Sequence, residues 1–110
     1  MASNSATGKI RVFTEASSST PTPNCDTTDI FEESALSTAP TIAAPTGTPT
    51  EGQPLFIFLT DNGTARALSW NSAYAATTVA LPTTTVISTR LRVAFLWNST
   101  SSKWDCIGVA

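Results

Sequence analysis

Residues 53–71 read QPLFIFLTDNGTARALSWN and decide the fold class that the sequence predicts. The run at 55–59 places leucine or isoleucine at every second position and phenylalanine between them, a period of two that is typical of a β-strand. The triplet Asp61-Asn62-Gly63 follows it. An Asn-Gly pair between two apolar runs is the strongest short-range signal for a hairpin turn. We therefore predict a β-hairpin over residues 53–71.

Both faces of the strand at 55–59 are apolar. Leu55, Ile57 and Leu59 share one face, and Phe56 and Phe58 share the other. A strand of this kind is either central in a sandwich or covered by another subunit. Phe56 and Phe58 are therefore candidate subunit-interface residues.

A second hairpin is predicted at the C-terminal end of the chain. Residues 89–97 alternate in hydrophobicity, residues 98–102 form the turn, and residues 103–109 return. We expect Trp104, Cys106 and Gly108 to share one face, with Ile107 and Val109 on the other. Trp97 and Trp104 flank the turn, so they can stack across the hairpin.

Shorter strands are expected elsewhere, and no helix is expected. Prolines recur every four or five residues between 40 and 54, which excludes a helix there. The run at 30–36 could form a helical turn, but it lacks a 3.6-residue repeat and favours a strand. The remaining strand candidates are residues 9–14, 41–44, 76–80 and 84–87.

These elements predict an all-β fold, namely a small antiparallel β-sandwich or flattened barrel of about seven to eight short strands. Residues 1–8 are small and polar and are expected to form a flexible N-terminal arm. Residues 9–110 form the single domain. Within it, residues 15–29 are a Ser/Thr/Pro connector whose length suggests that it is functional or draped over a neighbour.

Composition excludes several classes of function. The 110 residues carry six Lys+Arg and eight Asp+Glu with no histidine, whereas 33 positions are Ser or Thr, that is 13 Ser and 20 Thr. Nucleic-acid binding is not expected, because the basic residues form no patch. A membrane partner is not expected either, because the longest apolar run is far shorter than a membrane-spanning helix. The N-terminal residues show no secretory signal, so the chain is expected to remain in a cytoplasm.

The two cysteines, Cys25 and Cys106, do not have metal-site spacing. In a reducing cytoplasm we expect two free thiols that pack as small apolar groups. A bridge between them is the alternative, and it requires the first and last strands to meet.

Candidate catalytic groups are few, and no enzymatic activity, cofactor or metal is expected. Adjacent Glu32 and Glu33 point to opposite sides of a strand and cannot share a substrate. Asp61 is expected to bond the backbone of its own turn, and Asp105 to pair with Arg90 or Arg92. One loop carries several oxygen ligands that could coordinate calcium, namely those of Asn24, Asp26, Thr27 and Asp29. The spacing of a calcium-binding motif is absent, so an Asx turn is favoured.

Trp70, Trp97 and Trp104 each lie near a strand end, and they have two interpretations. Packing in the core and at the rim of a small sandwich is favoured. Alternatively, together with Phe56 and Phe58, they stack on a glycan or contact another subunit.

About 80% of the chain, from Asn24 to the C-terminus, resembles a small β-module of tailed-bacteriophage structural proteins. The resemblance rests on the order and spacing of several segments. They are Cys25-Asp26-Thr27-Thr28-Asp29, residues 41–49 (TIAAPTGTP), residues 61–71 (DNGTARALSWN), Leu81-Pro82-Thr83-Thr84-Thr85, Trp97-Asn98-Ser99-Thr100 and Lys103-Trp104-Asp105.

This resemblance implies a non-enzymatic virion protein. The short chain with its N-terminal arm favours a capsid decoration, or cement, protein that binds and stabilises the major capsid shell after assembly in the host cytoplasm. A homotrimer is expected, because shells offer threefold sites. The alternative is a tail, baseplate or tail-fibre module, with binding of a host-surface glycan as its activity.

Overall fold

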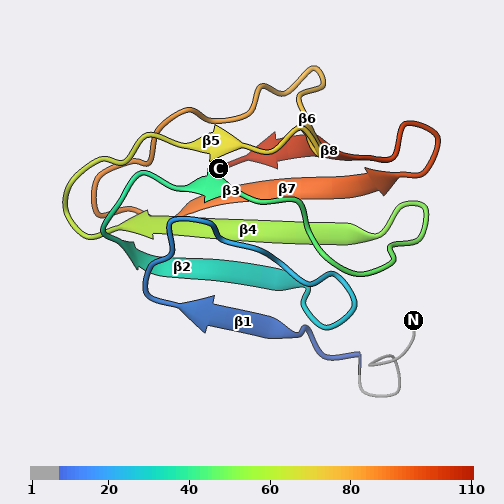
Figure 1. Cartoon of the computed structure of the whole chain (residues 1–110), viewed down its shortest axis with the longest axis horizontal. Helices are drawn as coiled ribbons and strands as arrows, with labels where there is room; N and C mark the ends of the chain where they lie inside the picture. Colours follow the sequence, from blue (N-terminus) through green and yellow to red (C-terminus); the bar gives the residue numbers. More distant parts are fainter. Residues whose placement is uncertain (1–7) are drawn as a thin grey trace.

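The computed structural model describes residues 8–110, so all but the last residue of the expected arm at 1–8 lies outside the described residues. The described part is all-β, as expected, with eight strands (Figure 1). It contains no helix of the length and hydrophobicity that crossing a membrane requires. The strands are β1 (Val12–Glu15), β2 (Ile30–Leu36), β3 (Thr41–Ile42), β4 (Pro54–Asp61), β5 (Ser69–Trp70), β6 (Tyr74–Ala75), β7 (Leu91–Asn98) and β8 (Lys103–Val109).

Six strands form a main sheet in the order β1-β2-β4-β7-β8-β6. The expectation of an antiparallel sheet is only partly right. The pairs β4–β7 and β7–β8 are antiparallel, whereas β1–β2, β2–β4 and β6–β8 are parallel. Parallel neighbours need a crossover connection of about a dozen residues or more. The two long proline-containing stretches between β1 and β2 and between β2 and β4 are these crossovers.

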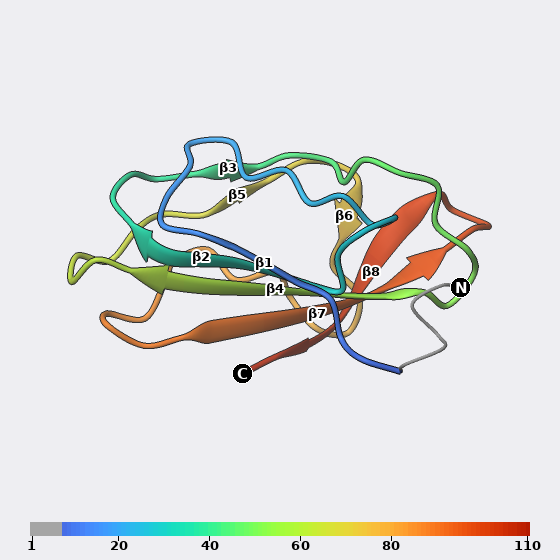
Figure 2. The ribbon, with the colours of Figure 1, turned by 90° about the horizontal axis from the view of Figure 1, so that it is seen from below.

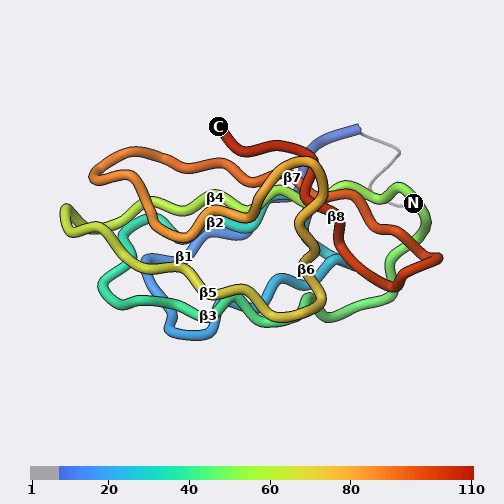
Figure 3. The backbone as a smooth tube through the Cα atoms, turned by 90° about the horizontal axis from the view of Figure 1, so that it is seen from above, coloured from blue at the N-terminus to red at the C-terminus, as the bar shows by residue number. Residues whose placement is uncertain are grey.

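The crossovers, together with the stretch after β4 that contains β5, build a second layer on one side of the main sheet (Figures 2 and 3). Strands β3 and β5 pair in parallel within it. The expected connector runs beside β3 in extended form, where the carbonyls of Ser19, Pro21 and Pro23 accept hydrogen bonds from residues 41, 43 and 46. Proline has no N–H but keeps its carbonyl, so Pro21 and Pro23 suit positions that only accept hydrogen bonds from this neighbour.

The core lies between the two layers. The alternation at 55–59 works as predicted: Leu55, Ile57 and Leu59 are fully buried, while the two phenylalanines on the other face are half-buried. The main sheet also buries Phe95 and Trp104, and the second layer adds Ile42. The main sheet therefore has an inner face that is sealed and an outer face that is not.

The C-terminal hairpin is confirmed, with one correction. Strands β7 and β8 pair antiparallel, and Trp97 lies opposite Trp104 with ring centroids 5.2 Å apart. The register shifts at Ile107, which lies between residues paired with Ala94 and Phe95. This β-bulge places Gly108 opposite Ala94 on the outer face, not on the inner face with Trp104.

The hairpin predicted over 53–71 does not form. Strand β4 is paired on one side with β2 and on the other with β7, so neither edge is free. Residues 69–70 instead form β5 in the second layer. A two-residue type I′ turn needs positive φ at both central residues, but only Gly63 has one, at 105°, and Asn62 does not. The turn reverses the chain without returning it to the same sheet.

The other short strands are partly as expected. Strands β1, β2 and β3 match the predictions at 9–14, 30–36 and 41–44 within a few residues. The segments at 76–80 and 84–87 are not strands, and the second contributes only an isolated bridge between Thr84 and Ala67.

Truncation of Phe95 will test the position of the core. Phe95 is fully buried against Trp70 and Tyr74, at centroid distances of 5.6 and 5.0 Å. We expect Phe95→Ala to lower the free energy of unfolding by about 3–5 kcal/mol. Phe13→Ala is the control, because Phe13 is 45% exposed and stacks on Phe31 at the sheet edge; it should cost about 1 kcal/mol. Equal losses in denaturant titrations would contradict this assignment of the core.

Candidate functional site

The face of the main sheet that points away from the second layer, here called the outer face, carries a continuous apolar row. Strand register places Val12, Ile30, Phe56, Ala94 and Gly108 side by side across five strands. The row begins with bulky side chains and ends with small ones. Val12 is 57% exposed. Among residues 8–110, no other layer covers this face (Figure 2).

A second row beside it carries charge. Register places Thr14, Glu32, Phe58 and Arg92 next to one another on the same face. Glu32 forms an ion pair with Arg90 at 2.9 Å, and the Arg90 guanidinium lies 5.2 Å from the centre of the Phe58 ring. The outer face therefore has an acidic group on β2 and a basic group on β7, with an aromatic ring between them.

The small residues at the end of the apolar row leave a groove of about 440 Å³. The groove exists because Ala94 and Gly108 leave room between bulkier neighbours, and its walls are almost purely apolar. The lining residues are Ile30, Phe56, Phe58, Arg92, Ala94, Gly108, Val109 and Ala110. Exposed apolar surface with this shape is typical of a contact site, so the outer face is the candidate functional site.

The three tryptophans lie away from this face, so the structure separates them from Phe56 and Phe58. Trp104 is 2% exposed, and its candidacy as a contact or glycan-stacking residue is wrong. Trp70 and Trp97 pack against the same core. The Trp70 indole N–H donates to the Pro82 carbonyl at 2.8 Å. These positions agree with the core-and-rim interpretation of the sequence.

Asp61 organises the turn that was predicted to close the hairpin. Its carboxylate accepts hydrogen bonds from the N–H groups of Gly63 and Ser88, at 3.0 and 2.9 Å, and from the Thr85 hydroxyl at 2.7 Å. These bonds, that from Ser88 first, lower the pKa of Asp61. The expected bond to its own turn is confirmed. Asp61 also holds both ends of the loop that exposes Val86 and Ile87.

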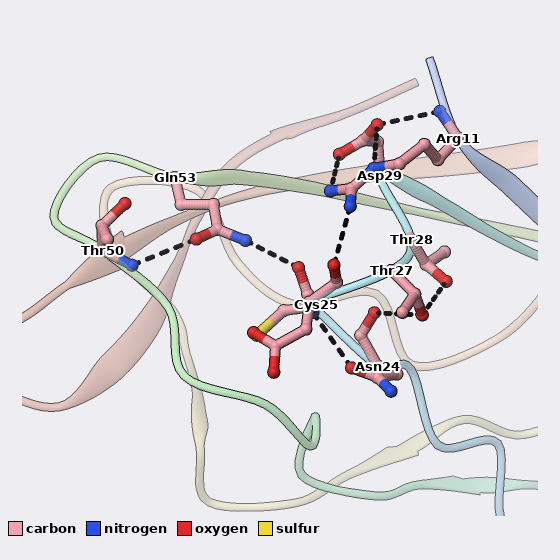
Figure 4. Close-up of polar contacts among 9 residues, drawn as sticks. Arg11, Asn24, Cys25, Thr27, Thr28, Asp29, Thr50 and Gln53 are labelled. Atoms are coloured by element: carbon pink, nitrogen blue, oxygen red, sulfur yellow. Dashed lines mark hydrogen bonds and ion pairs between the residues drawn. The ribbon is translucent and has the colours of Figure 1, made fainter. Parts of the chain in front are cut away.

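The loop at 24–29, weighed as a calcium site, has other partners for its oxygens (Figure 4). Both carboxylate oxygens of Asp29 accept from the Arg11 side chain, which lowers the pKa of Asp29. The Asp26 carboxylate accepts from the N–H of Thr48. The Asn24 side chain accepts from the N–H of Asp26, which is the favoured Asx turn. Residues 8–110 contain no group of three or more His, Cys, Asp or Glu side chains that could hold a metal.

The remaining acidic candidates are also separate from one another. Glu32 lies on the outer face and Glu33 on the inner face, as expected for adjacent residues of a strand. Asp105 accepts from the Asn98 side-chain amide at 3.1 Å. The expected pairing of Asp105 with Arg90 or Arg92 is wrong. Arg90 pairs with Glu32, and Arg92 makes no ion pair within residues 8–110.

Both cysteines are free thiols buried in the core, as predicted. Burial raises the pKa of each thiol, so both are poor nucleophiles near neutral pH.

Sequence reasoning missed the chemistry of Glu33. Its side chain is fully buried on the inner face of β2, and in the described part of the chain neither carboxylate oxygen has a hydrogen-bond partner. Register places Glu15 of the edge strand β1 directly beside it. Burial first, and then the neighbouring Glu15, raise the pKa of Glu33 to about 9. Because Glu33 lies at an inward position between Phe31 and Leu36, the strand pattern could have identified it as an inward-facing acid.

Comparisons of the chain with protein-family models, with curated proteins and with solved structures find no match. The case for function therefore depends on the sequence pattern and on the outer face.

The raised pKa of Glu33 predicts that the free energy of unfolding falls as pH rises. Its folded-state pKa of about 9 lies above the ordinary value of 4.5, so the unfolded chain releases this proton first. The contribution is fully present below pH 4.5 and is lost as pH rises toward 9. We expect the melting temperature at pH 8 to be lower than at pH 5, and Glu33→Gln to raise it at pH 8.

Glu32→Gln is the matched control for that experiment, since it changes the adjacent glutamate on the outer face. It should leave the pH dependence in place. A pH profile that is the same in Glu33→Gln and in the unmodified chain would show that Glu33 is ionised in the folded protein.

Proposed function

We propose that this chain is a structural protein of a tailed-bacteriophage virion, and specifically a capsid decoration protein that binds and stabilises the major capsid shell. It acts in the assembled particle as a homo-oligomer and catalyses no reaction. The chain is made in the host cytoplasm and functions on the virion.

The observation that carries the proposal is the uncovered outer face. The sandwich already seals its core on the inner face, so Phe56, Phe58 and the adjoining groove are not needed to complete it. Leaving such residues exposed to water is unfavourable, and on a soluble domain it indicates a contact surface. A sheet face with an apolar row beside a short charged row suits a protein whose task is to attach to other subunits.

Two further features support the same proposal. The order of motifs from Asn24 to the C-terminus resembles a β-module of phage structural proteins. Most acidic side chains of the described residues are engaged with arginines, with backbone N–H groups or with side-chain hydroxyls and amides. Glu33 is enclosed in the core, with Glu15 beside it at the sheet edge.

Purified phage particles will test the proposal. We expect this chain to be present in a copy number comparable with that of the shell subunit, and electron cryo-microscopy to show its density on the capsid. Particles that lack the chain should lose their DNA at lower temperature than complete particles. Adding back the purified protein should restore the difference.

Attachment should depend on the outer face. We expect Phe58→Ser to weaken rebinding to stripped particles, whereas Ile87→Ser should rebind normally, because Ile87 lies on an exposed loop away from the groove. Density confined to the tail would contradict the decoration role and favour the tail-module alternative. Absence of the chain from particles would contradict both.

A further inference from the structure

We infer that the outer face binds the outer face of a second copy of this chain, around a two-fold axis that runs along β4. The inference rests on the proposed function and deepens it: the outer face joins two copies into the homo-oligomer that binds the shell, so Phe58→Ser weakens rebinding by separating the two copies. It differs from the trimer expected from shell geometry, because a closed pair of identical faces requires a two-fold axis.

The outer face is complementary to itself in the size of its side chains. A two-fold axis between facing sheets and parallel to β4 reverses the strand order of the second copy. It brings β2 of one copy over β7 of the other, and β1 over β8. Ile30 then faces Ala94, and Val12 faces Gly108, in both directions. Bulky side chains enter the groove that small ones leave, while Phe56 meets its own symmetry mate.

The outer face is also complementary to itself in charge. The same axis brings Glu32 of one copy over Arg92 of the other, and it does so twice. Arg92 is exposed and makes no ion pair within residues 8–110. Glu32 uses Oε2 for Arg90, while Oε1 meets only the Thr14 hydroxyl, at 3.4 Å. The apolar row supplies the driving force, and the charged row sets the orientation of the pair.

The proposed axis also agrees with the way in which β-sheets pack face to face. Sheets that pack face to face keep their strands within about 30° of each other and lie about 10 Å apart. An axis along β4 keeps the two copies of β4 parallel to each other, so the pair forms an aligned sandwich. No strand of the second layer lies on this side of the main sheet, although the described residues before β1 and the C-terminal end project from it (Figure 3).

The mass of the purified full-length chain in solution will test the inference. We expect sedimentation equilibrium to show a monomer–dimer equilibrium. Val12→Ser should raise the dimer dissociation constant by about tenfold or more, because the substitution is present in both copies and removes the same apolar contact at two places. Ile87→Ser is the matched control, because both residues are 57% exposed and only Val12 lies on the outer face. It should leave the dissociation constant unchanged.

Gly108→Val provides a second test, which fills the groove without disturbing the fold. A Cβ at Gly108 would meet only the Ala94 Cβ, at 3.9 Å, and φ there is not positive. We expect this variant to melt normally and to be monomeric. A trimer, a chain that is monomeric at all concentrations, or a dimer unaffected by both Val12→Ser and Gly108→Val would overturn the inference. If a monomeric chain still binds stripped particles, the proposed function stands and the pairing alone fails.

Discussion

Parallel pairing around β4 is the constraint on which the rest of the molecule depends. Strand β4 runs parallel to β2 and antiparallel to β7, and β2 is parallel to β1 in turn. Each parallel step requires the chain to leave the sheet and return at the starting end. The crossovers at 16–29 and 37–53 meet this requirement, and both pass over the same side of the sheet (Figure 2). That side therefore becomes the core, and the described residues leave the opposite side uncovered.

Features of this fold that depend on residues close together in the chain could be predicted from the sequence, whereas features that depend on distant residues could not. The alternation at 55–59 and the cross-strand pair of Trp97 with Trp104 are local patterns, and both were predicted. The partners of β4 are set by residues far away in the chain, so an Asn-Gly signal at 62–63 was mistaken for a hairpin. The bulge at Ile107, which moves Gly108 to the outer face, has a weak local signal in that glycine, because a glycine inside a strand pattern often marks a bulge. Strict alternation over 103–109 was predicted instead.

The candidate site was half predictable for the same reason. Two apolar faces on one strand predicted Phe56 and Phe58 as contact residues, and the structure leaves both on the uncovered face. The groove beside them depends on Ala94 and Gly108, and small residues carry no signal until strand register brings them together. Trp104 shows the opposite error: a residue type that is common at interfaces belongs here to the core.

The one long local hairpin has a consequence for the order in which the sheet can form. Among residues 8–110, β7 and β8 are the only long neighbouring strands joined by a short turn. The mutual pairing of β1, β2 and β4 must first overcome the entropy of closing long loops. Pairing of β7 with β8 therefore needs the least loop-closure entropy, and it can precede the parallel pairs. Until β2 and β7 have paired with β4, the apolar strand at 55–59 has both of its edges open to aggregation.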